Sequence, residues 1–173
     1  MVKLQKLRVI NLALNEDITF DMAGKVLLSH IEGLGITDVS AERTQSVLQD
    51  GSDVYGILLE DRVIRLEATI RESNREELYK LRRKLMRIIN PKTFNRNTKN
   101  KGELLLFYTN DYKTYRIYAH IEDAVDVKTR VNNNMKLDIV FTANTPYLLD
   151  EKNTKLAIKA FIGRTFISTK VAK

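Results

Sequence analysis

The stretch RVIRLEATIRESNREELYKLRRKLMRIINP, residues 62–91, decides the fold class because a strand pattern leads directly into a helix pattern. Apolar and polar side chains alternate over its first part. The alternating apolar positions are Ile64, Leu66, Ala68 and Ile70. A period of two residues predicts a β-strand with one buried face and one solvated face.

The second part of the stretch predicts an amphipathic helix over about residues 73–90. Ser73 can cap the first turn, and Glu76 stands where it completes a capping box. Pro91 disfavours helical geometry at Asn90, so the helix is expected to end there. At about 100° per residue the apolar side chains form one stripe and the basic ones lie opposite. The stripe contains Leu78, Leu81, Leu85, Ile88 and Ile89, and the basic side chains are Lys80, Arg83, Lys84 and Arg87.

The positive charge of the chain is local. Residues 71–101 contain 11 Lys or Arg and 3 Glu, a net of +8, which leaves 7 − 8 = −1 for the rest of the sequence. This charge divides between the helix and the polar loop that follows it. A basic helix face is unspecific, so a solvated surface or a protein contact is favoured, and nucleic-acid binding stays open as the alternative.

The segments around this stretch have strand patterns. ELLLFYTN and TYRIYAHIED flank a turn near Asn110, and AVDVKTRV and MKLDIVFT flank a run of asparagines. KLRVINLAL, ITF and KVLLSHIEG are shorter candidates near the start. We therefore predict a mainly β (α+β) protein, an antiparallel sandwich or barrel with one helix packed on a sheet. The polar segment 42–53 is expected to form a projecting arm or a long loop.

The sequence shows no sign of catalysis, of a cofactor or of a metal site. It has no cysteine, which excludes disulfides and thiolate ligands, and no apolar run approaches the roughly 20 residues that cross a bilayer. The fragment GLG at Gly33 lacks the third glycine of a dinucleotide site, because Asp38 stands there. His30 and His120 are interpreted as ordinary strand residues without a carboxylate at ligand-like spacing.

The order of these segments resembles the N-terminal domain of siphophage distal tail proteins. The residues that carry the resemblance are Asp50-Gly51, Arg62 at the head of a strand, Asn90-Pro91, Gly102 and Pro146-Tyr147. The resemblance implies a structural virion protein without enzymatic activity. Its copies would form a ring, usually hexameric, that joins the tail tube to the baseplate or tail-tip adhesion device. The implied location is the virion tail, assembled in the cytoplasm of the host bacterium.

The resemblance also implies a division of the chain and a set of partners. Residues 1–150 would be the ring-forming domain, and residues 151–173 a last strand or a linker toward a second domain. The partners would be other copies of the chain, the tail-tube protein and the tip or receptor-binding proteins, with no specific nucleic acid and no membrane insertion. A tail-tube subunit and a basic nucleic-acid-binding module remain the alternatives.

Candidate contact residues for these partners come from the polar segment 42–53, the basic helix face and the loop 92–101. They are Arg43, Gln45, Lys80, Arg83, Lys84, Arg87, Lys92, Arg96, Lys99 and Lys101.

Overall fold

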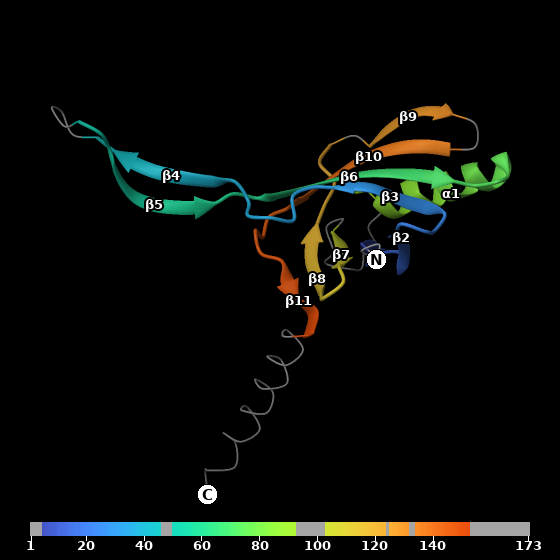
Figure 1. The fold of residues 1–173 in the computed structure, drawn as a ribbon, viewed down its shortest axis with the longest axis horizontal. Helices are drawn as coiled ribbons and strands as arrows, with labels where there is room; N and C mark the ends of the chain where they lie inside the picture. The colour runs from blue at the N-terminus through green and yellow to red at the C-terminus, as the bar shows by residue number, and fades with distance from the viewer. Residues whose placement is uncertain (1–4, 46–49, 93–102, 124, 132–133, 153–173) are drawn as a thin grey trace, which may run out of the picture.

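The fold is an open sandwich of two antiparallel sheets, with a helix at one end and a long hairpin at the other (Figure 1). The computed structural model describes residues 5–45, 50–92, 103–123, 125–131 and 134–152. Sheet A has the strand order β11 (Leu149–Asp150), β8 (Thr114–Ala119), β7 (Leu104–Thr109), β1 (Lys6–Asn11) and β2 (Glu16–Phe20). Sheet B has the order β3 (Val26–Ile31), β6 (Arg62–Arg71), β10 (Asn134–Ala143) and β9 (Asp126–Val131).

Every strand pair within these sheets is antiparallel, as predicted. The alternation in β6 buries Ile64, Leu66, Ala68 and Ile70 and exposes the residues between them, except Thr69, which is half-buried. The turn between β7 and β8 is closed by Asn110, whose Oδ1 accepts hydrogen bonds from the backbone N–H groups of Tyr112 and Lys113. The sheets do not close on themselves, so the sandwich and not the barrel is the correct alternative.

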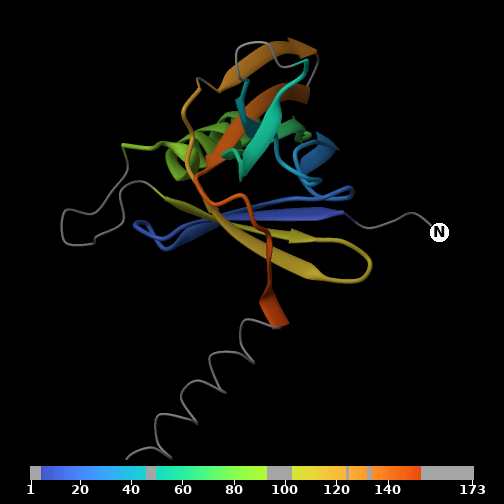
Figure 2. The ribbon, with the colours of Figure 1, turned by 90° about the vertical axis from the view of Figure 1, so that its left-hand side faces the viewer.

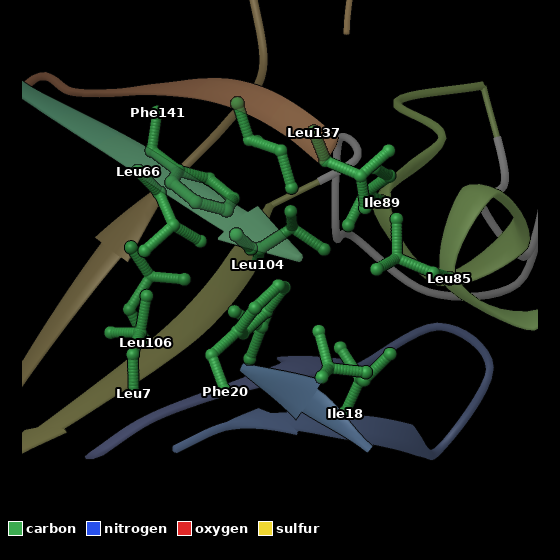
Figure 3. Packing of buried hydrophobic residues seen from close by; sticks show 14 of the residues in the cluster. Leu7, Ile18, Phe20, Leu66, Leu85, Ile89, Leu104, Leu106, Leu137 and Phe141 are labelled. Atoms are coloured by element: carbon green, nitrogen blue, oxygen red, sulfur yellow. The ribbon is translucent and has the colours of Figure 1, made fainter. Parts of the chain in front are cut away.

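The core lies between the inner faces of the two sheets (Figure 3). Sheet A contributes side chains such as Leu7, Phe20 and Leu106, and sheet B contributes Leu66 and Phe141, all almost inaccessible to solvent. Figure 2 shows sheet A as a layer below sheet B and the helix. The burial of one side of each strand explains why the sequence alternates.

The helix α1 (Arg75–Ile89) begins later than predicted. Asn74, not Ser73, is the N-cap residue, and its side chain accepts a hydrogen bond of 2.9 Å from the backbone N–H of Glu76. The helix ends before Asn90, whose extended backbone is what Pro91 requires. Its apolar stripe contacts β1 and β2 of sheet A and also β6 of sheet B. The helix therefore packs on sheet A, as predicted, and also contacts β6 of sheet B.

A buried side chain joins the end of the helix to sheet A. Asn11 at the end of β1 is almost fully buried, and its Nδ2 donates a hydrogen bond of 2.7 Å to the carbonyl of Ile88. Carbonyls in the last turn of a helix have no partner within the helix, so this bond satisfies one of them. It also fixes the direction in which α1 leaves the sandwich.

Candidate interaction surfaces

The first candidate surface is a two-stranded hairpin, here called the arm, formed by β4 (Val39–Thr44) and β5 (Asp53–Leu59). The arm projects from the sandwich at the end opposite to α1 (Figure 1). Its register pairs Val39 with Leu59 and Ala41 with Ile57, which places these four side chains on one face. We call them the apolar arm face. All four are exposed, Ile57 to 68%.

A two-stranded hairpin is marginally stable alone in water and needs packing against another surface. The opposite face of the arm is more polar and contains Ser40 and Glu42 beside Gly56 and Leu58. The Glu42 side chain lies across Gly56, whose missing Cβ leaves room for its carboxylate. The arm is thus amphipathic, and no described element of the same chain covers its apolar face. An isolated protomer leaves this surface in contact with water, which favours an external partner.

Arg62 holds the base of the arm. It is the first residue of β6, lies on the buried side of the strand and is only 6% exposed. Its guanidinium donates hydrogen bonds to the carbonyls of Gly33, Gly35 and Pro146, with Nε 2.8 Å from Pro146 O and Nη1 2.8 Å from Gly35 O. Burial lowers the pKa of this guanidinium from its usual value, although an arginine remains charged. Arg62 thus joins the segment that enters the arm to the segment that follows β10.

Gly33 provides the second constraint at the arm base. Its backbone φ is +84°, a region that residues with a side chain rarely adopt. A Cβ built on Gly33 would lie 1.9 Å from the carbonyl oxygen of Val63, which is closer than any contact allows. Gly33 therefore belongs to a tight approach of two backbones and not to a dinucleotide site. Gly35 has open space around it, so the close approach concerns Gly33 alone.

The second candidate surface is the basic face of α1. Lys80, Arg83, Lys84 and Arg87 line one shallow hollow of about 470 Å³, so the structure brings these four predicted residues together. Acidic side chains neutralise part of their charge: Lys80 Nζ lies 2.9 Å from Glu76, and Arg87 lies 2.6 Å from Glu16 of β2. Hydrogen bonds and ion pairing with Glu76 and Glu77 raise the pKa of Lys80. The hollow is less positive than its sequence suggests.

The other predicted contact residues are scattered. Arg43 lies on β4 and Gln45 just beyond it, both exposed on the arm, whereas Lys92 is exposed just after α1. Because the arm and α1 lie at opposite ends of the molecule, these residues form two separate surfaces (Figure 1). Arg96, Lys99 and Lys101 fall outside the described residues, as do Gly102 and residues 153–173.

The two histidines form local pairs that the sequence interpretation missed. His30 Nε2 lies 3.0 Å from Glu32, and His120 Nε2 lies 2.9 Å from Glu122, because residues i and i+2 of an extended chain face the same side. The hydrogen bond with His120 lowers the pKa of the Glu122 carboxyl. Each pair has one carboxylate and is largely exposed. Among the residues that the structure describes, no group of three or more acidic or histidine side chains is arranged to hold a metal ion.

Sequence comparison connects this architecture to a known family. The family described as "Phage tail protein RIFT-related domain" matches residues 16–143, which include all of sheet B, the strands β2, β7 and β8 of sheet A, the arm and α1. The chain belongs to this family of phage tail proteins. No curated protein sequence matches it significantly. Within the described ranges, no helix of this tail protein is long and apolar enough to cross a bilayer.

Solved structures share the fold of this tail protein. The Dit protein of phage SPP1, described as a paradigm of the hub adsorption apparatus in phages that infect Gram-positive bacteria, has a TM-score of 0.53 and 13% identity over 84% of this chain. Chains of the phage P2 baseplate in its activated conformation, with Ca and with Sr, have a TM-score of 0.61 and 21% and 20% identity over the same share. The chain spans about half the length of these proteins, 51% of the SPP1 chain and 45% of the P2 chains. The predicted resemblance is confirmed for the family and the fold.

Sequence reasoning missed the two features that define the arm surface. The apolar arm face was not predicted because the prediction for this region rested on the polar stretch 42–53. The run VYGILL at residues 54–59 nevertheless has the composition of a strand. Arg62 stood out only as a family position. Its role depends on carbonyls that are distant in sequence, which no local pattern reveals.

Proposed function

We propose that this chain is the ring-forming subunit at the distal end of a long phage tail, where it joins the tail tube to the baseplate or tail-tip adhesion device. The proposal is supported by family membership over residues 16–143 and by a fold shared with a hub protein and with baseplate chains. Copies of the chain are its first partners, and the tube protein and the tip proteins are the others. The expected number of copies in the ring is six.

The arm is the observation that carries the proposal. It is a two-stranded hairpin with an exposed apolar face on the outside of an otherwise well-packed sandwich. Such a surface gains stability only by packing against something else, since an apolar area contributes about 25 cal/mol per Å² when it leaves water. A subunit that assembles with copies of itself supplies that cover at every position around a closed ring.

A structural role also agrees with the chemistry of the surface. The family is one of tail proteins, and the two histidine–glutamate pairs that the structure describes are partly exposed hydrogen-bonded pairs with one carboxylate each, not a pocket with converging acid, base and nucleophile. We therefore expect no catalysed reaction. Residues 151–173 are proposed to form a last strand or a linker toward a second domain. The assembled ring is expected in the virion after assembly in the host cytoplasm.

Native mass spectrometry of the purified chain, with and without duplex DNA, tests the proposal. The expected result is one discrete oligomer, a hexamer, whose mass does not change when DNA is added. A protomer that stays monomeric at high concentration contradicts the proposal. Binding of DNA that falls steeply as salt rises would favour the nucleic-acid module instead, and long stacks of rings in electron micrographs would favour a tail-tube subunit.

Hydrogen exchange tests whether the arm and the loop 92–101 are the contact segments. We expect the amides of the arm to exchange quickly in dilute protomer and slowly in the assembly. The amides of β6 and β10, which pair in the centre of sheet B, provide the internal control because they are protected in both states. If neither segment gains protection on assembly, the prediction that the arm and the loop 92–101 are contact sites is wrong.

A further inference from the structure

The outer face of sheet A carries a second apolar surface, on the side turned away from the core. Cross-strand register forms one row from Ile10, Leu105 and Tyr118. The next row contains Phe107 and Leu149 on either side of Arg116. We call the five apolar residues the outer patch. They are half-buried or exposed, with Tyr118 at 42% and Leu149 at 41%, although four of them lie on the internal strands β1, β7 and β8.

No described helix or strand from outside sheet A lies over the outer patch. In Figure 2 the blue and gold strands of sheet A have sheet B and α1 on one side only. A sheet face exposed to water normally carries polar residues at alternate positions, and the outer face of sheet B does so with Arg65, Glu67 and Lys136. The composition of the outer patch is therefore that of a covered face.

We propose that the outer patch receives the apolar arm face of a neighbouring copy of this chain, an inference that rests on the proposed ring. Each protomer has two apolar surfaces that differ from one another, one on the arm and one on sheet A. The arm points away from its own body, so it does not reach its own outer patch (Figure 1). Contact between two different surfaces is heterologous. A linear chain of subunits would leave one uncovered arm at one end and one uncovered outer patch at the other, and closure into a ring covers both.

Charge selects this pairing over contact between two arms. Residues 38–61, which contain the arm, have six acidic residues and one basic residue, a net of −5, so the rest of the chain carries 7 − (−5) = +12. Two arms would repel each other, whereas an arm and a body attract. The outer face of sheet A has Arg116 beside the apolar rows, together with Arg8, which is ion-paired with Asp17 of β2. An acidic hairpin that lies across this face brings opposite charges together at its margins.

A buried arginine donor on the outer face of sheet A has no acceptor within the described part of the protomer. The Nε of Arg116 is buried and has no hydrogen-bond acceptor among the described residues. Such a donor is costly unless a partner supplies an acceptor, and the arm offers carboxylates and the unpaired backbone carbonyls of its strand edges. On α1 the Nε of Arg82 is also buried without an acceptor among the described residues, but Lys80 and Arg87 already have carboxylate partners within the protomer, so the charge of that face is partly neutralised.

Engineered cysteines test the proposal directly because the natural chain has none. The variant with Ile57→Cys and Tyr118→Cys places one thiol on the apolar arm face and one on the outer patch. With a bifunctional maleimide whose span is about 10 Å, the separation of packed sheets, we expect a ladder of covalent species that ends at the full ring. The variant with Ile57→Cys and Lys84→Cys is the matched control, and we expect it to remain monomeric in the denaturing gel.

The outcomes separate this inference from the proposed function. A ladder from the Lys84→Cys control, or covalent dimers from Ile57→Cys alone, would overturn the outer patch as the receiving surface. Native mass spectrometry that shows an intact ring without the expected ladder overturns the patch and leaves the ring standing. A monomeric natural chain overturns both. As a second readout, Tyr118→Glu is expected to raise the concentration of half-assembly by about tenfold or more, as for a central interface residue. Lys136→Glu, at an exposed position on the outer face of sheet B, should leave it unchanged.

Discussion

Gly33 shows how one residue without a side chain controls the route of the chain into the arm. Replacement by alanine combines a positive φ with a Cβ that overlaps the backbone of Val63. We expect Gly33→Ala to lower the free energy of unfolding by at least about 2 kcal/mol. Gly35→Ala is the control, because a Cβ there meets no other atom, and it should change stability by less than about 0.5 kcal/mol. Urea denaturation of the two variants measures the difference, and equal losses would contradict the argument.

The buried phenol of Tyr108 is expected to make the free energy of unfolding fall at alkaline pH. Burial, reinforced by nearby Asp111, raises the pKa of its phenol above the ordinary value of 10.0. The unfolded chain therefore loses this proton first, so the contribution of Tyr108 is complete below about pH 10 and is lost as pH rises through the folded pKa. We expect Tyr108→Phe to lose less stability than the natural chain between neutral pH and about pH 11, where the unfolded phenol is ionised.

The exposed Tyr112 provides the comparison for that experiment. Its side chain is 82% exposed at the turn between β7 and β8. Thermal melts of the natural chain, Tyr108→Phe and Tyr112→Phe should therefore agree at neutral pH, and only Tyr108→Phe should depart from the others in alkali. If Tyr112→Phe gives the same protection, the alkaline loss does not come from the buried phenol.

At the scale of elements, Arg62 joins three segments that the chain separates widely. Its replacement by methionine keeps the length of the side chain and leaves the carbonyls of Gly33, Gly35 and Pro146 without their donor. We expect Arg62→Met to cost about 2–3 kcal/mol of unfolding free energy and to loosen the base of the arm. Arg65→Met, an exposed position on the same strand, is the matched control and should cost less than about 0.5 kcal/mol. A small effect at Arg62 would show that the arm base is held by other contacts.

The elements with regular periods could be predicted from the sequence, whereas the irregular segment 42–53 could be predicted only as a projecting arm or a long loop. Alternation marked β6, and the 3.6-residue stripe marked α1, because burial acts on one side of each element. The arm followed neither rule. Its apolar side chains lie outside the core, and a register shift between Glu42 and Arg43 interrupts the alternation. The sequence could not distinguish Ser73 from Asn74 as the N-cap residue, because serine and asparagine side chains accept the same hydrogen bond from the first turn of a helix.

At the scale of the whole molecule, the family resemblance predicted a ring, whereas local patterns predicted only a sandwich with a helix. The four helix residues Lys80, Arg83, Lys84 and Arg87 do lie together, as their spacing requires. The partnership of Arg87 with Glu16 could not be predicted, because it depends on how α1 packs beside β2. The outer patch is likewise a product of tertiary structure, since it combines strands from both ends of the chain, β1 and β11.

The separation of charge within the molecule makes assembly sensitive to salt. Residues 38–61 carry −5 and the remainder +12, so the approach of an arm to a neighbouring body is attractive and is screened as the Debye length shortens from about 10 Å at 0.1 M salt to about 3 Å at 1 M. We expect sedimentation to show that assembly weakens several-fold between 0.1 M and 1 M salt. Assembly should not be lost completely, because salt does not screen the apolar contact. The variant with Glu42→Gln and Asp53→Asn removes two charges from the arm and should reduce the salt dependence, whereas Glu76→Gln on α1 should not. Assembly that strengthens with salt in the natural chain and in both variants alike would show that apolar contact alone drives it and that the charge of the arm has no part in it.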